Sequence, residues 1–113
     1  MLPAKHRLTK DKEFNNIFKK GKSSYSTTLG IKVVKNNLDY SRFGILVGVK
    51  VSKKAIVRNR IKRLIREIIH ARLKELKTGY DVVIIAQAQV VDQTKEEIKQ
   101  GLVAQIKKLH LYK

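Results

Sequence analysis

The chain has 113 residues, no cysteine, and 26 lysines and arginines against 9 aspartates and glutamates, which gives a formal net charge of +17. The length predicts a single domain spanning residues 1–113, and the apolar fraction of 42% argues against intrinsic disorder. The absence of cysteine excludes disulfides and cysteine-ligated zinc and fits a reducing cytoplasm. The positive charge predicts a polyanionic partner, which is RNA, DNA or an anionic membrane surface.

Neither a membrane span nor a secretory signal is expected. No stretch approaches the ~18 uninterrupted apolar residues of a transmembrane helix. The first residues, MLPAKHRL, lack the apolar segment of a signal peptide. We therefore expect a cytoplasmic protein.

The N-terminal part predicts a basic arm over residues 1–8 and a first helix over residues 10–20. Thr9 is the predicted N-cap, and Gly21 suits the position after the helix. Spacing of i, i+3 and i+4 places three apolar side chains on one face of this helix: Phe14, Ile17 and Phe18.

Alternating apolar residues predict strands in the next segment. A short edge strand is expected at residues 23–25, and longer half-buried strands at 27–34 and 42–50. The two longer strands are expected to pair as an antiparallel hairpin. Gly44 and Gly48 share one face of the second strand, where a helix or ligand can approach the sheet closely.

The second half predicts a helix over residues 52–77, a doubly buried strand over 80–86 and a terminal helix. Thr94 and Glu97 form a capping box at the start of the terminal helix. The predicted order is therefore α-β-β-β-α-β-α. We expect an α+β sandwich in which the helices pack on one mixed, four-stranded sheet.

The helix after residue 52 combines a buried apolar stripe around Ile61 with a dense basic surface. A solvated charged face is the usual explanation of such a run. That explanation is weak here, because Glu67 is the first acidic residue of the helix and no acid before it compensates the cations. We therefore favour nucleic-acid binding through phosphate contacts. The candidate binding residues are Lys50, Lys53, Lys54, Arg58, Asn59, Arg60, Lys62, Arg63 and Arg66.

No catalytic constellation is visible in the sequence. The three histidines are scattered, and no nucleophile elbow, P-loop or zinc-protease motif occurs. We predict no catalytic residue and no metal bound by the protein, although spacing in sequence leaves a paired-carboxylate site open.

Phe14 and Phe18 allow two interpretations. Both rings can pin the first helix to the sheet as part of the core. They can also form a stacking platform for unpaired bases, a contact worth ~1–3 kcal/mol per base. Composition alone does not decide between the two.

The stretch AIVRNRIKRLIR at residues 55–66 resembles the signature helix of the bacterial ribonuclease P protein component. The opening LPAKHRL, the phenylalanine pair followed by Lys19-Lys20-Gly21, and TGYDVVIIA at residues 78–86 are also similar to that family. The resemblance therefore covers nearly the whole chain.

The resemblance implies a subunit of a ribonucleoprotein whose RNA, with Mg²⁺ ions, removes the 5′ leader of precursor tRNA. The expected partners are the catalytic RNA and precursor tRNA, with no obligate protein partner and no membrane. The basic residues listed above would contact the catalytic RNA and the adjoining leader. A cleft between the first helix and the sheet would hold the leader, and its expected lining is Phe14, Phe18 and Lys32. The family's fold also implies a left-handed β-α-β crossover, whereas pattern alone favours a right-handed one.

Two positions depart from the family's pattern. Lys32 stands at a cleft position that is often aromatic, so a leader there would meet a cation instead of a ring. The segment before Ala55 lacks the family's usual glycine, which implies a different turn into the helix.

Three other functions are alternatives to this interpretation. A general RNA chaperone or ribosome-associated protein would bind unrelated RNAs equally well. An autonomous nuclease would need the catalytic groups that the sequence lacks. A membrane-surface helix would expose its large apolar residues, whereas this helix needs its stripe to cover the sheet.

Overall fold

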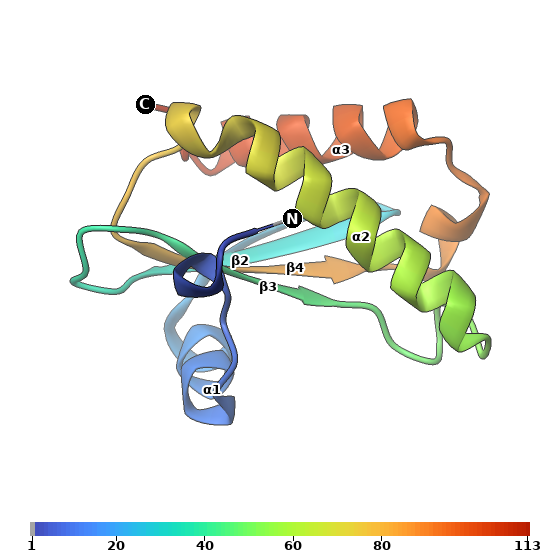
Figure 1. The fold of residues 1–113 in the computed structure, drawn as a ribbon, viewed down its shortest axis with the longest axis horizontal. Coiled ribbons are helices and arrows are strands. Elements are labelled where there is room, and N and C mark those ends of the chain that lie inside the picture. The colour runs from blue at the N-terminus through green and yellow to red at the C-terminus, as the bar shows by residue number, and fades with distance from the viewer. Residues whose placement is uncertain (1) are drawn as a thin grey trace.

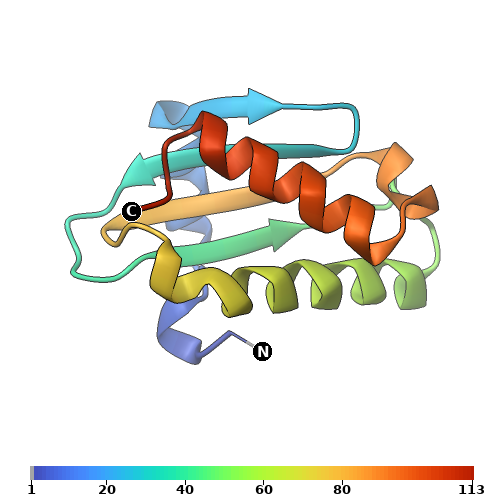
Figure 2. The same ribbon diagram turned by 90° about the horizontal axis from the view of Figure 1, so that it is seen from above.

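The computed structural model describes residues 2–113 as a four-stranded mixed sheet with helices on both faces (Figure 1). Helix α1 lies on one face, and α2 and α3 lie side by side on the other (Figure 2). The predicted order of elements is confirmed. The elements are α1 (Asp11–Lys20), β1 (Lys22–Tyr25), β2 (Leu29–Lys35), β3 (Arg42–Leu46), α2 (Ala55–Arg72), β4 (Tyr80–Ala86) and α3 (Lys95–Lys108).

The strand order in the sheet is β1-β2-β4-β3, so the predicted hairpin of β2 with β3 is wrong. β4 lies between them, antiparallel to β2 and parallel to β3. The reason is burial: Val82, Val83 and Ile84 are apolar on both faces of β4 and need neighbours on both sides. β3, α2 and β4 thus form a parallel β-α-β unit, and its implied left-handed sense stays a prediction.

The core has two layers, one on each face of the sheet. On the larger side, the stripe of α2 around Ile61 and Ile65 and the inner face of α3 cover Leu29, Ile31 and Ile84. The other layer is a smaller cluster under α1, made of Leu8, Ile17 and Val83. The buried stripe predicted for the basic helix is therefore confirmed.

The end of α1 at Lys20, followed by Gly21, and the start of α3 agree with the predictions, and the other helix ends differ. Lys10, not Thr9, precedes α1, and its N–H donates to the Glu13 carboxylate (3.2 Å). α2 starts at Ala55 and ends at Arg72, shorter than the predicted 52–77, because a turn precedes it and a 3₁₀ segment follows it. The capping box is confirmed by reciprocal bonds between Thr94 and Glu97, of 2.9 and 3.2 Å.

The N-terminal segment is not a free arm. Leu2 and Leu8 are buried, and the Leu8 N–H donates to the Phe43 carbonyl oxygen (2.9 Å), so the segment runs along the edge of β3. Met1 of the predicted arm lies outside the described residues. Two apolar anchors thus override the basic composition of the segment.

β3 ends at Leu46 instead of residue 50, because the chain turns at Gly48, whose carbonyl accepts the Val51 N–H (3.0 Å). Val49, which lies within the predicted strand 42–50, is 67% exposed. Close approach is confirmed at Gly44, where a Cβ would lie 2.6 Å from the Phe14 ring, and is wrong at Gly48, where a Cβ would meet nothing within 4 Å.

Gly44→Ala is expected to lower the free energy of unfolding by about 1–3 kcal/mol, because the new methyl group overpacks the contact with Phe14. Gly48→Ala is the matched control and should change stability by less than about 1 kcal/mol. Urea unfolding of both variants checks this. Equal stabilities would contradict the close packing of α1 on β3.

Candidate nucleic-acid interface

The predicted basic residues of α2 occupy its outer surface. Arg58, Lys62 and Arg66 follow one another at i, i+4 and i+8 and are half-buried along one flank. The remaining three side chains of the set are exposed: Asn59, Arg60 and Arg63. The first three turns of the helix therefore present cations to solvent, while Ile61, Ile65, Ile68 and Ile69 face the sheet and Ile56 is exposed.

These cations have no acidic partner within the described part of the chain. Glu67, the first acid of the helix, pairs instead with Lys95 of α3 (Nζ to Oε2, 3.5 Å). Asn59, Arg63, Arg66 and Glu67 line a hollow of about 330 Å³ on this face. Like charges at this spacing repel one another, and an anionic partner would remove that repulsion.

Arg58 also has a structural task. Its Nη1 donates to the Ser52 carbonyl oxygen (2.9 Å), which ties the helix to the turn before it. Lys50, Lys53 and Lys54 are exposed in that turn, and no acidic residue follows in the first turn of α2. The positive end of the helix dipole thus adds to the cationic field.

The two phenylalanines of α1 are in different environments. Phe14 is half-buried against Gly44 and the cluster of Leu8, Ile17 and Val83. Phe18 is 41% exposed, and the Lys32 Nζ lies 5.5 Å from the centre of its ring. The core interpretation therefore suits Phe14, and Phe18 is the ring available to a ligand.

Beside α1, one row of residues that crosses the sheet is only partly covered by other elements. The strand registers pair Tyr25 with Gly30, Gly30 with Ile85, and Ile85 with Leu46, so these four residues cross all four strands in a line. Gly30 is buried, Ile85 and Leu46 are half-buried, and Tyr25 is 50% exposed. We call these four residues the open row.

The open row leads to the turn before α2. A hollow of about 510 Å³ joins Leu46 and Ile85 of the open row to Val49 and Lys50. The two predicted groups of site residues begin on opposite faces of the sheet (Figure 1). They are connected through this end of β3 and β4.

Arg42 holds α1 at the other end of the sheet. Its Nε and Nη2 donate to the two carboxylate oxygens of Asp81 (2.8 and 2.7 Å), and its Nη1 pairs with Glu13 of α1. Hydrogen bonding to Asp81 raises the pKa of the Arg42 guanidinium above its ordinary value, so this cation is permanent. It is committed to the fold and is not available to a ligand.

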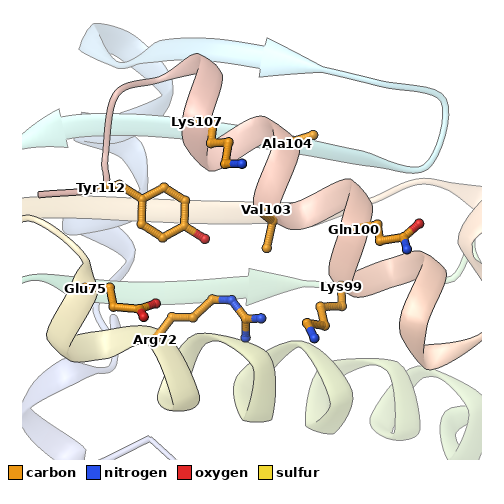
Figure 3. A pocket seen from close by; sticks show the side chains of 8 residues that line it. All are labelled: Arg72, Glu75, Lys99, Gln100, Val103, Ala104, Lys107 and Tyr112. Atoms are coloured by element: carbon orange, nitrogen blue, oxygen red, sulfur yellow. The ribbon is translucent and has the colours of Figure 1, made fainter.

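A further groove, of about 630 Å³, lies between the end of α2 and α3 (Figure 3). It contains Arg72, Lys99 and Lys107 beside Glu75, and it shares no residue with the predicted sites. Within residues 2–113 no cluster of three potential metal ligands occurs, and no helix is long and apolar enough to cross a membrane.

The sequence analysis did not single out Tyr25, whose ring is 50% exposed on the same face of the sheet as Lys32. It lies in the short edge strand, whose polar composition hides its pairing with Gly30. The available signal was the absence of a side chain at Gly30 on the same face as Lys32, which leaves space for a neighbouring ring.

A mixed four-stranded sheet that carries one uncompensated basic helix defines a small basic α+β protein with a surface suited to a polyanion. The family model described as Ribonuclease P matches residues 2–110. The chain belongs to the ribonuclease P protein family, the protein components of a tRNA-processing endoribonuclease that is assembled with RNA.

Relatives and solved structures agree with this assignment. The ribonuclease P protein component of Clostridioides difficile is 44% identical over 84% of this chain and 83% of its own length. That of Clostridium botulinum is 37% identical over 95% of this chain and 96% of its own. The Staphylococcus aureus RNase P protein superposes with a TM-score of 0.89 at 29% identity, covering 96% of this chain and 98% of its own. The Thermotoga maritima protein gives a TM-score of 0.82 at 32% identity, covering 90% and 96%.

Phe14→Ala should lower the free energy of unfolding by about 2–3 kcal/mol, less than the 3–5 kcal/mol typical of a fully buried phenylalanine. Phe18→Ala should lower the free energy of unfolding by less than about 1 kcal/mol, because this side chain is 41% exposed. Thermal unfolding of the two variants measures the difference, with Phe14→Leu as the control that keeps an apolar contact. A larger loss at Phe18 would reverse the assignment of the two rings.

Proposed function

We propose that this chain is the protein subunit of ribonuclease P that binds the catalytic RNA through α2 and holds the single-stranded 5′ leader of precursor tRNA beside α1. The hydrolysis itself belongs to the RNA with its Mg²⁺ ions, in the cytoplasm. The chain supplies affinity and position, and it needs no protein partner.

The observation that carries the proposal is the uncompensated cationic surface of α2 in a chain of this family. The side chains that face solvent or the RNA are Asn59, Arg60, Lys62, Arg63 and Arg66, with Lys50, Lys53 and Lys54 at the N-terminal end of the helix. An arginine guanidinium can donate two parallel hydrogen bonds to two phosphate oxygens, and a lysine ammonium group acts as a point charge. Arg58 supports this surface through its bond to Ser52 and adds its own charge.

The second part of the proposal is the leader cleft. Phe18 offers an exposed ring for stacking, Lys32 offers a cation for the backbone, and the open row offers an apolar floor. Phe14 keeps α1 seated and borders the cleft at its base. By holding the leader, the protein would bind precursor more tightly than mature tRNA, and by fixing the RNA it would favour the Mg²⁺ sites of the RNA.

Reconstituted enzyme should therefore bind precursor tRNA with a leader more tightly than tRNA without one, and removing the protein should remove most of that difference. Phe18→Ala should weaken binding of the leader-bearing precursor by about fivefold or more, because one stacking contact is worth ~1–3 kcal/mol. Equilibrium binding to the assembled particle measures this. If the wild-type protein increases the binding of both substrates equally, the leader-cleft proposal is contradicted and a general RNA-binding protein is favoured.

Arg66→Ala should flatten the dependence of log affinity for the catalytic RNA on log salt concentration by up to about one unit, because one phosphate contact is lost. Lys108→Ala is the matched control, since Lys108 is an exposed cation at the end of α3, away from α2's basic surface. Filter binding between ~50 and 200 mM salt gives both slopes. If the control changes the slope as much as Arg66→Ala does, α2 is not the docking surface.

A further inference from the structure

Tyr25 sits in the place that a side chain at residue 30 would take. The two residues face each other across β1 and β2, and a Cβ built on Gly30 would overlap two carbons of the Tyr25 ring. The ring is nonetheless 50% exposed. It is therefore held against the sheet on one side and open to solvent on the other.

The neighbours of Tyr25 supply the other groups that a nucleotide strand needs. Gly30 and Lys32 alternate with the buried Leu29, Ile31 and Val33, so Lys32 lies on the same face of the sheet as Tyr25. The Lys32 Nζ lies 5.5 Å from the Phe18 ring centre. Two exposed rings, Phe18 from α1 and Tyr25 from β1, thus flank a region that contains one cation.

A structural explanation accounts for only part of this arrangement. Tyr25 covers the backbone of β2 at Gly30, which any large side chain on β1 could do. Cover alone gives no reason for a half-exposed aromatic ring on the four-residue edge strand KSSY. A second copy of this chain is a poor occupant, because each carries a net charge of +17.

We propose that Tyr25 is a second stacking platform of the leader cleft, beside Phe18, and extends the cleft from α1 across β2 onto β1. This inference rests on the proposed function. One unpaired base stacks on Phe18 and another on Tyr25, and the Lys32 ammonium group contacts the phosphate backbone between them. Because Gly30 on β2 has no side chain, it makes room for the ring that Tyr25 supplies from β1.

The test compares Tyr25→Ala, Tyr25→Phe and Gly30→Ala in particles reconstituted from the full chain and the catalytic RNA. Tyr25→Ala should weaken binding of precursor tRNA with a long leader by about tenfold and leave binding of leaderless tRNA unchanged. Tyr25→Phe should bind like the wild type, because the ring remains.

Gly30→Ala should weaken leader binding as well, because the new methyl group displaces the Tyr25 ring. It should add no further loss in a Tyr25→Ala background, which a general loss of stability would not reproduce. Thermal unfolding of each variant provides the control for folding.

The full chain titrated with a single-stranded uridine hexamer, followed by nuclear magnetic resonance, gives an independent readout. The Tyr25 ring resonances should shift together with those of Phe18. If Phe18→Ala weakens leader binding and Tyr25→Ala does not, the role of Tyr25 is overturned. Tyr25 resonances that do not shift on titration would also overturn it. Either result leaves the proposed function unaffected. If the wild-type particle binds precursor tRNA and leaderless tRNA equally well, the proposed function is contradicted instead. The hexamer titration would still decide whether Tyr25 contacts RNA.

Discussion

The guanidinium group of Arg42 connects three elements of this protein. It binds both carboxylate oxygens of Asp81 on β4 and pairs with Glu13 on α1, while its own backbone begins β3. Because these contacts lie at one end of the sheet, α1 is held over that end and leaves the opposite end, where Leu46 ends β3, more accessible. The position of α1 on the sheet therefore depends on an ion-paired cluster. The apolar contacts of Phe14 and Ile17 then complete the seating of the helix.

Elements with a local signal could be predicted from the sequence, and their pairing could not. The stripe of α2, the capping box at Thr94 and the buried strand β4 depend on residues a few positions apart, and all three are present. The hairpin of β2 with β3 was wrong because alternation shows which face of a strand is buried but not which strand lies beside it. The basic arm at residues 1–8 was wrong because its charge is more conspicuous than its two buried leucines.

In the candidate site, too, features with a local sequence signal could be predicted and contacts between distant elements could not. The cations of α2 were predictable because they share one helix, where spacing determines their common surface. The burial of Phe14, unlike that of Phe18, depends on Gly44, and the position of the Tyr25 ring against the sheet depends on Gly30. Each of these pairs joins elements that are distant in the sequence or cross between strands. A glycine has no side chain to reveal which neighbour occupies its space, so such contacts become visible only in three dimensions.

The N-terminal segment along β3 has a consequence for the protein before it meets RNA. The exposed edge of a strand is a template on which another chain can add a strand and start aggregation. Here the Leu8 N–H occupies the Phe43 carbonyl oxygen at one edge, and the other edge is the short strand β1 with Lys22 at its start. Both borders of the sheet are thus poor templates. A free chain therefore offers few unpaired backbone groups for sheet-to-sheet association.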